Sequence, residues 1–315
     1  MSNTQQRISI GLIGGTAKLC ALLKHLQKIG IHPAWAILQH PDPSERDPSF
    51  EITKKILAEE QISWAAGDDA PIEEIVASFD KKVDVIFCTG WRRLLPKSIL
   101  EGPHEGCLVA HDSLLPAFRG RATLNWQIIL GQSESGLTLF RADEKVDHGL
   151  IFAQEKIEIG PNESIVEASE KINALIGPLY ARWIEAKISG QLLYFEQKHE
   201  KATYTCTRSA KDSLIDWKMS AQEIHNLVRA LAAPWPQAYT FLNGQRLEIA
   251  ESEILKDAPR YLGRVPGRVV SVSKEGADLL CGADILRVKL LTLQDGSTHP
   301  AQEIVKSVRD TFSDK

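Results

Sequence analysis

The stretch that decides the fold runs from Leu108 to Gly149 and reads LVAHDSLLPAFRGRATLNWQIILGQSESGLTLFRADEKVDHG. It opens on an apolar run that predicts the end of a buried strand, and His111 stands where that strand stops. A second apolar run at residues 136–140 predicts another strand, and Asp147 lies in the polar loop that follows it. Because open α/β sheets place their ligand sites outside the carboxyl ends of strands, we expect both side chains at one edge of a sheet.

Upstream of this stretch, the pattern predicts alternating strands and helices. A strand over residues 8–13 breaks at Gly14-Gly15, a helix covers 17–29, and a second strand covers 35–38. This βαβ order predicts a mostly parallel, Rossmann-like sheet. The full dinucleotide fingerprint is absent, so a tight turn is the simpler interpretation of the two glycines. An acceptor phosphate near the helix N-terminus stays an alternative.

The sequence pattern of the last third of the chain predicts a separate domain. Residues 191–201 form a polar, charged connector, which places the boundary between a catalytic domain over 1–200 and a second domain over 201–315. Ser220 and Glu223 have the spacing of a capping box and predict a helix start. Short, glycine-punctuated strands follow and predict a small, OB-like β-barrel. The expected fold class is therefore α/β, with a Rossmann-like domain followed by a barrel domain.

Composition narrows the classes of function. The chain has 315 residues, a formal net charge of −4 and a sequence pI of about 6.2. Its five cysteines are widely spread, without a CxxC pair or a His/Cys cluster, so we expect reduced thiols, no metal site and a cytoplasmic location. No stretch approaches the ~20 apolar residues of a membrane span.

The central stretch resembles a known family. The string His-x-Ser-Leu-Leu-Pro-x-x-Arg-Gly at residues 111–120, followed by Asp-x-Gly at 147–149, is similar to the formyltransferases. That family includes methionyl-tRNA formyltransferase, nucleotide-aminosugar N-formyltransferases and the hydrolase domain of 10-formyltetrahydrofolate dehydrogenase. Pro-Trp-Pro at 234–236, with the helix before it, resembles the family's C-terminal barrel domain. The resemblance implies 10-formyltetrahydrofolate as co-substrate.

The resemblance also implies roles for single residues. His111 would donate to the oxyanion of a tetrahedral intermediate, and Asp147 would orient His111 and accept the proton of the attacking amine. Ser113 and Asn125 are candidate supporting donors, although capping a turn is the simpler role for Ser113. Arg119 either holds its loop or binds the carboxylate tail of the folate. The residues expected to line the folate pocket are Trp91, Arg92, Leu94, Leu95, Leu114, Pro116, Arg119, Ala142, Asp143 and Val146.

One position departs from the family pattern. The transferases usually read Asn-x-His where this chain reads Val109-Ala110-His111, so the asparagine amide is missing. Loss of one oxyanion donor typically costs ~10²–10³ in kcat. The hydrolase domain named above is similar to this chain in carrying an aliphatic residue there. Hydrolysis of 10-formyltetrahydrofolate is therefore a serious alternative, and a folate-binding protein without catalysis is another.

The charge pattern favours a small acceptor over tRNA. The loop at residues 40–50 reads HPDPSERDPSF, in which acidic residues outnumber the arginine. Residues 201–315 hold sixteen Lys and Arg against fourteen Asp and Glu, a net of +2. Because a phosphate backbone is bound through Lys and Arg, we expect no specific nucleic-acid partner. The expected acceptor is a small amine, with a nucleotide-linked amino sugar leading; methionyl-tRNA and a homodimeric state stay open.

Overall fold

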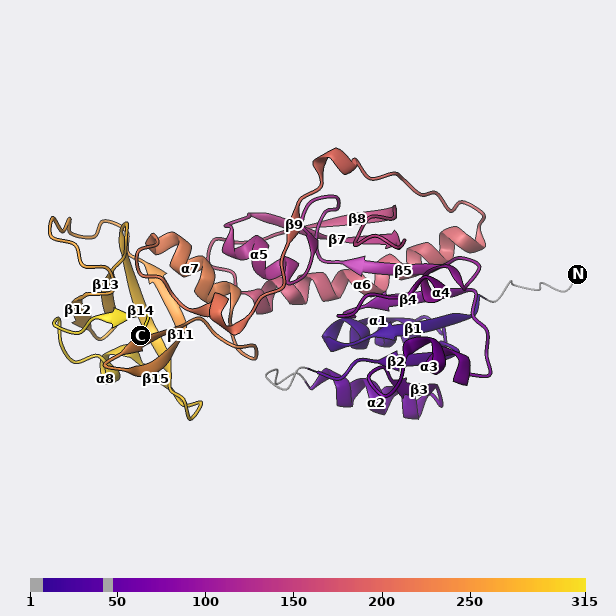
Figure 1. Cartoon of the computed structure of the whole chain (residues 1–315), viewed down its shortest axis with the longest axis horizontal. Coiled ribbons are helices and arrows are strands. Elements are labelled where there is room, and N and C mark those ends of the chain that lie inside the picture. Colours follow the sequence, from indigo (N-terminus) through magenta and orange to yellow (C-terminus); the bar gives the residue numbers. More distant parts are fainter. Residues whose placement is uncertain (1–7, 42–47) are drawn as a thin grey trace, which may run out of the picture. The chain divides into compact units, whose positions relative to one another are not determined.

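The protein packs as two compact units in a computed structural model that describes residues 8–41 and 48–315 (Figure 1). The loop segment Asp42–Asp47, on which the acidic-loop prediction depends, lies outside the described residues. No described helix is long and apolar enough to cross a membrane. The first unit contains residues up to 123, 134–158 and 169–206; the second contains 124–133, 159–168 and 207–315.

A seven-stranded sheet forms the centre of the first unit (Figure 1). In sheet order its strands are β3 (Ser63–Ala66), β2 (Trp35–Leu38), β1 (Ile10–Gly14), β4 (Val85–Thr89), β5 (Cys107–His111), β7 (Glu134–Arg141) and β8 (Leu150–Glu158). The strands from β3 to β5 are parallel, which confirms the prediction from the βαβ order. At the β5 edge the direction reverses, because β7 and β8 are added antiparallel.

Helices cover both faces of this sheet. They are α1 (Thr16–Lys28), α2 (Ser49–Glu59), α3 (Ile72–Ser78), α4 (Lys97–Glu101) and the long α6 (Ile165–Ile188). The predicted helix over residues 17–29 is confirmed as α1, which buries an apolar stripe of Leu19, Leu22, Leu23 and Leu26. Helices α3 and α4 pack on the opposite face, where their isoleucines join Trp35 and Cys107 in one apolar cluster.

Two buried aromatic residues of α6 hold this helix against the sheet. Tyr180 and Trp183 are fully buried, and both rings contact Phe87 of β4. The Tyr180 hydroxyl lies 2.7 Å from the carbonyl oxygen of Cys88 and 3.1 Å from that of Leu108. A buried hydroxyl normally needs such a partner, so these contacts offset the desolvation of Tyr180. They also fix α6 against the two strands that lead to the site.

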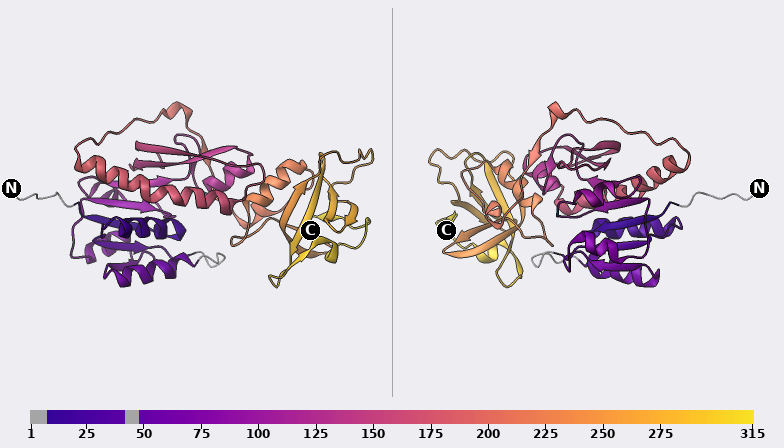
Figure 2. Two further views of the ribbon diagram at one scale, coloured as in Figure 1. Left: turned by 180° about the vertical axis from the view of Figure 1, so that it is seen from behind. Right: turned by 45° about the vertical axis from the view of Figure 1, so that its right-hand side comes forward.

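The second unit is built on an antiparallel sheet that curls into a half-barrel (Figure 2). The predicted capping box is present: Ser220 Oγ accepts from Glu223 N, and Glu223 Oε2 accepts from Ser220 N at 2.8 Å. The expected α/β fold with a small β domain is thus confirmed, with a half-barrel in place of a closed barrel. Its elements are α5 (Thr123–Ile129), α7 (Ala221–Ala230), β10 (Tyr239–Leu242), β11 (Gln245–Ile254), β12 (Val269–Ser273), β13 (Gly276–Leu280), β14 (Ile285–Thr292), β15 (Thr298–Pro300), α8 (Ala301–Ile304) and β16 (Phe312–Ser313).

Candidate active site

His111 and Asp147 lie side by side at the edge of the sheet in the first unit. His111 is the last residue of β5 and is buried, with its Nε2 atom 2.8 Å from the carbonyl oxygen of Phe118. Because a carbonyl oxygen can only accept, Nε2 carries a proton. The other ring nitrogen, Nδ1, lies 3.6 Å from Asp147 Oδ2, which is an ion-pair distance and longer than a hydrogen bond.

Asp147 is presented by a tight turn between β7 and β8. Its backbone φ of 47° lies in the left-handed region, which aspartate tolerates better than most residues with a Cβ. Its Oδ2 atom accepts a hydrogen bond of 2.8 Å from the backbone N–H of Gly120. This N–H holds the carboxylate toward His111, so the two side chains that the sequence places 36 positions apart converge as predicted. Their catalytic roles stay predictions.

Val109 faces the same side of β5 as His111, because residues two apart in a strand share a face. In the sheet it stands between Cys88 of β4 and Phe140 of β7. Its half-buried side chain packs beside an apolar cluster of Leu115, Phe140 and Ile151. The position that carries an amide in the resembling transferases is therefore an apolar wall next to the imidazole.

The predicted supporting donors form structural hydrogen bonds. Ser113 Oγ donates to the carbonyl oxygen of Ala117 at 2.7 Å, which matches the simpler turn-capping role. Asn125 belongs to the second unit, and its Nδ2 donates to the carbonyl oxygen of Ala230 at 2.8 Å. The oxyanion roles of Ser113 and Asn125 stay predictions.

Arg119 is buried and faces inward, with 2% of its surface exposed. Its guanidinium donates to Gln197 Oε1 at 2.6 Å and to the Tyr204 hydroxyl at 3.1 Å, and it contacts His199 Nδ1 at 2.9 Å. A side chain held this way favours the loop-holding alternative over a contact with the folate tail. These partners of Arg119 were missed from the sequence: Gln197 and His199 lie in the segment interpreted as a connector, and Tyr204 lies in the predicted second domain.

A hollow lies beside the loop after β4. Its volume is about 380 Å³, and Trp91, Leu94 and Leu95 from the predicted folate set line it with Ile72, Glu73, Arg93 and Pro96. Arg93 stacks over the Trp91 ring at 4.6 Å. The Trp91 Nε1 atom is buried and has no hydrogen-bond partner among the described residues. An apolar wall with a few polar groups suits a flat heteroaromatic ligand such as a pterin.

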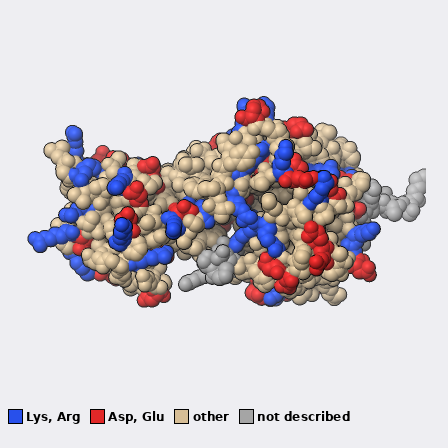
Figure 3. Space-filling model, viewed as in Figure 1, with Lys and Arg blue, Asp and Glu red and all other residues tan. Residues whose placement is uncertain are grey.

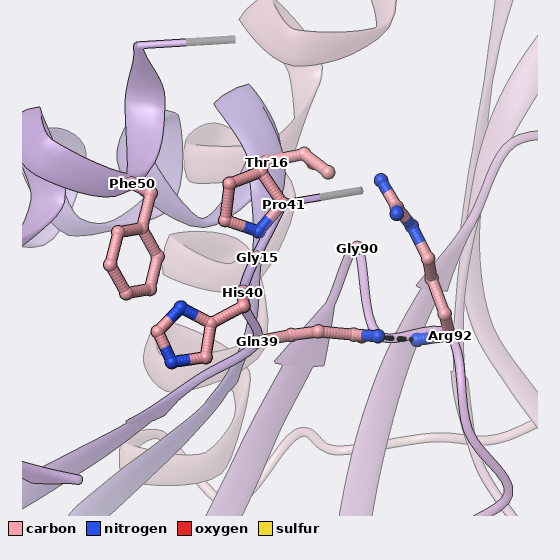
Figure 4. A pocket seen from close by; sticks show the side chains of 8 residues that line it. All are labelled: Gly15, Thr16, Gln39, His40, Pro41, Phe50, Gly90 and Arg92. Atoms are coloured by element: carbon pink, nitrogen blue, oxygen red, sulfur yellow. Dashed lines mark hydrogen bonds between the residues drawn. The ribbon is translucent and has the colours of Figure 1, made fainter. Parts of the chain in front are cut away.

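The other predicted folate residues lie elsewhere on the loops. Arg92 lines a separate hollow with the Gly15–Thr16 turn, His40 and Phe50 (Figure 4). Asp143 is engaged locally, since it accepts from Lys145 N at 2.9 Å and pairs with His148 Nδ1 at 2.7 Å. Leu114, Pro116, Ala142 and Val146 do not line the Trp91 hollow, so their folate contacts stay predictions.

The hollow at the Gly15–Thr16 turn is small and built by close backbone approach. Gly90 has a φ of 67°, and a Cβ atom there would lie 2.4 Å from the carbonyl oxygen of Gly15. Gln39 Oε1 accepts from Arg92 N at 2.7 Å, as drawn in Figure 4. Within residues 8–41 and 48–315, no group of three or more His, Cys, Asp or Glu side chains could hold a metal ion.

The comparisons with known proteins identify the class to which this fold and site belong. The formyl transferase family matches residues 7–183, and the formyl transferase C-terminal domain matches residues 208–309. The chain therefore belongs to the formyl transferase family, and it is a formyltransferase that carries both parts of the family's architecture. This confirms the resemblance inferred from residues 111–120 and 147–149.

Two curated relatives cover most of the chain. It is 30% identical to a methionyl-tRNA formyltransferase of Sorangium cellulosum, covering 87% of this chain and 85% of the relative. It is 32% identical to a methionyl-tRNA formyltransferase of Geobacter metallireducens, covering 96% of both. These relatives are named for a tRNA substrate, in contrast to the small acceptor that the charge pattern favours.

Solved structures share the fold at low identity. An N-formyltransferase from Helicobacter canadensis, in complex with folinic acid and dTDP-3-aminofucose, has a TM-score of 0.67 at 19% identity and covers 89% of this chain and 99% of its own. HypX from Aquifex aeolicus, in complex with tetrahydrofolic acid, has a TM-score of 0.63 at 15% identity and covers 96% of this chain but only 48% of its own. At these identities the likeness shows the fold alone.

Proposed function

We propose that this protein transfers the formyl group of 10-formyltetrahydrofolate to the primary amine of a small molecule, with a nucleotide-linked amino sugar as the leading acceptor. The observation that carries the proposal is the pair formed by His111 and Asp147 at the end of β5, 3.6 Å apart. The hollow at Trp91, which lies in the same unit, supports a folate site. Solved relatives with folinic acid or tetrahydrofolic acid support the same co-substrate.

The chemistry is acyl transfer by way of a tetrahedral intermediate. The amine nitrogen attacks the formyl carbon while Asp147 takes the amine proton, and the carbonyl oxygen becomes an oxyanion. The proton that Asp147 took is then delivered to N10 of the folate, the oxyanion re-forms the carbonyl as the bond between N10 and the formyl carbon breaks, and the N-formyl product and tetrahydrofolate leave. No covalent enzyme intermediate is required, since the amine is itself the nucleophile.

His111 supplies the donor for the oxyanion. Its Nε2–H now points at the Phe118 carbonyl oxygen, so it must exchange that partner for the formyl oxygen, or the ring must carry a second proton on Nδ1. Catalytic hydrogen bonds commonly tighten only when substrate is bound, and the 3.6 Å separation between His111 Nδ1 and Asp147 Oδ2 is compatible with that.

Charge supports the small acceptor. On the face of the second unit seen in Figure 3, Lys and Arg are interspersed with Asp and Glu and form no continuous basic band. Residues 201–315 are near neutral, with a net charge of +2. A tRNA acceptor would need several phosphate contacts, each adding to a steep salt dependence. The relatives' names keep methionyl-tRNA as the competing acceptor.

Hydrolysis of 10-formyltetrahydrofolate is the second candidate, and Val109 is the observation behind it, because the hydrolase domain that resembles this chain also carries an aliphatic residue there. Attack by water would generate the same oxyanion as attack by an amine, so the hydrogen bond that Val109 cannot supply is missing in both reactions, and Val109 is compatible with both. In a hydrolase, Asp147 would activate water in place of an amine. A transferase instead has to keep water from the formyl carbon until its acceptor binds.

One experiment separates these functions. Purified protein is given 10-formyltetrahydrofolate, alone and with a panel of nucleotide amino sugars, simple amines and methionyl-tRNA, and both formate and N-formyl products are measured. We expect formate release without acceptor to be far slower than N-formylation of the true acceptor. Rapid formate release that no amine changes would refute the transferase and establish the hydrolase.

A further inference from the structure

A strap formed by residues 191–206 contacts the loop at Phe118–Gly120 and the turn that carries Asp147, all within the first unit. It is held at several points: Phe195 exchanges two backbone hydrogen bonds of 2.8 Å with Ile151 of β8. Further along, Thr203 Oγ1 accepts from Phe118 N at 2.8 Å, and β9 (Tyr204–Thr205) pairs in parallel with β6 (Arg119–Gly120). The strap is therefore part of the site's framework.

Gln197 is the residue of the strap that reaches the Asp147 turn. Its side chain is buried, with 5% of its surface exposed. The Nε2 atom donates to the carbonyl oxygen of Asp147 at 3.0 Å and to that of Gly149 at 2.8 Å. The Oε1 atom accepts from Arg119 at 2.6 Å. Both amide protons and the amide oxygen are thus used, which is a fully satisfied buried carboxamide.

These contacts set the backbone from which the Asp147 carboxylate projects. Asp147 sits at a positive φ, a conformation that costs energy for a residue with a Cβ and persists only where its surroundings hold it. Gln197 binds the carbonyl groups on both sides of His148 and so spans the turn. Through Arg119 it also binds the loop whose Gly120 N–H is hydrogen-bonded to the carboxylate.

We infer that Gln197 is a positioning residue for catalysis: it fixes the Asp147 turn so that the carboxylate faces His111. The inference rests on the proposed role of Asp147 in formyl transfer. Gln197 touches neither reacting atom and acts through Asp147 alone. A misplacement of about 1 Å at a reacting group can cost ~10²-fold in rate. Loss of the three hydrogen bonds of Gln197, which together clamp the Asp147 turn, should therefore lower kcat by a larger factor than it changes the KM for 10-formyltetrahydrofolate.

The test variant is Gln197→Met, which keeps the length and volume of the side chain and removes all three hydrogen bonds. Gln197→Glu is the second variant; it retains an oxygen for Arg119 and cannot donate to the two carbonyl groups. The matched control is Tyr194→Phe, which removes the 2.9 Å hydrogen bond from Trp183 Nε1 to the same strap, away from the turn. Thermal unfolding of each variant reports whether it folds.

The kinetic measurement is formyl transfer from saturating 10-formyltetrahydrofolate to the amine that the acceptor panel identifies, in the single variants and in the double variant of Gln197→Met with Asp147→Asn. We expect Gln197→Met to lower kcat by about 10- to 100-fold with the KM for 10-formyltetrahydrofolate within about threefold, and Tyr194→Phe to change kcat by less than about threefold. In an Asp147→Asn background, Gln197→Met should lower the residual rate by less than about threefold, because the two residues act as one unit.

The outcomes distinguish this inference from the proposed function. If Asp147→Asn is slow and Gln197→Met and Gln197→Glu keep the wild-type kcat, the positioning role is wrong and the catalytic pair stands. An equal loss in Tyr194→Phe, or a full additional loss in the Asp147→Asn background, would also overturn it, since either points to general loosening. If Asp147→Asn itself keeps the wild-type kcat, the proposed function fails and the inference fails with it.

Discussion

Restoring an amide at position 109 should raise the transfer rate at a cost in stability. In Val109→Asn the carboxamide would project from β5 on the same face as His111, two residues before it. The change removes half-buried methyl groups from beside Leu115 and Phe140 and brings in a polar group, which we expect to lower the free energy of unfolding by about 1–3 kcal/mol. One oxyanion donor typically contributes ~10²–10³ in kcat, about 3–4 kcal/mol.

As long as the variant stays folded, the loss of stability does not lower its kcat, so kcat for N-formylation should rise at least about tenfold. The assay compares kcat at saturating 10-formyltetrahydrofolate and amine in wild type, Val109→Asn and Val109→Leu, with thermal unfolding in parallel. Val109→Leu is the control, since it changes shape without adding a donor. A folded Val109→Asn protein with an unchanged or lower kcat would show that the site does not use a donor at this position.

Four further predictions follow from the same structure. His111→Ala and Asp147→Asn should each lower kcat by about 10²–10⁴-fold while the fold persists; near-wild-type turnover in either would contradict the catalytic pair. Methionyl-tRNA titrated near physiological salt should show at most weak, salt-sensitive binding, and a submicromolar Kd with a steep salt slope would contradict the small acceptor. Burial, followed by the nearby Arg229 charge, lowers the pKa of His225 below its ordinary 6.5. Because the unfolded chain then binds this proton more tightly, the free energy of unfolding should fall as the pH drops below about 6.5, by at most ~1.4 kcal/mol per pH unit. Denaturant unfolding of wild type and His225→Gln between pH 5 and 8 measures the part of this loss that is due to His225. Burial raises the pKa of Cys281 to about 12, so iodoacetamide at pH 8 should alkylate the exposed Cys206 and leave Cys281 unmodified in the folded protein, as peptide mapping would show.

The local sequence pattern was enough to predict most of the helices and strands. The apolar spacing of α1, the run of β2 and the capping box at Ser220 are short-range features, with periods of 3.6 or 2 residues or fixed offsets. The ends of the first strand and helix shifted by one or two residues; β1, for example, begins at Ile10 where we predicted residue 8. The ends are hard to predict because the last turn of a helix or the last residue pair of a strand frays, and its own sequence does little to fix where the element stops.

Some features of the site could not be read from local pattern. The segment 191–201 reads as a polar connector, because its polar side chains show no period that would mark a buried face. In the fold, it lies against the first unit and buries Gln197. The sequence likewise left two alternatives for Arg119, holding its loop or binding the folate tail, because a single arginine in a loop does not show which partner its side chain binds.

The sequence by itself determined the βαβ order, the family and the strand-end positions of His111 and Asp147, because these depend on apolar runs and on a motif that is contiguous in the chain. Only the tertiary structure decided that β7 and β8 join antiparallel, that Val109 forms an apolar wall and that Gln197 clamps the Asp147 turn. The clamp joins residues 50 positions apart through bonds to backbone carbonyl groups. Every residue has such a carbonyl, so the sequence carries no mark of which one a distant side chain will bind.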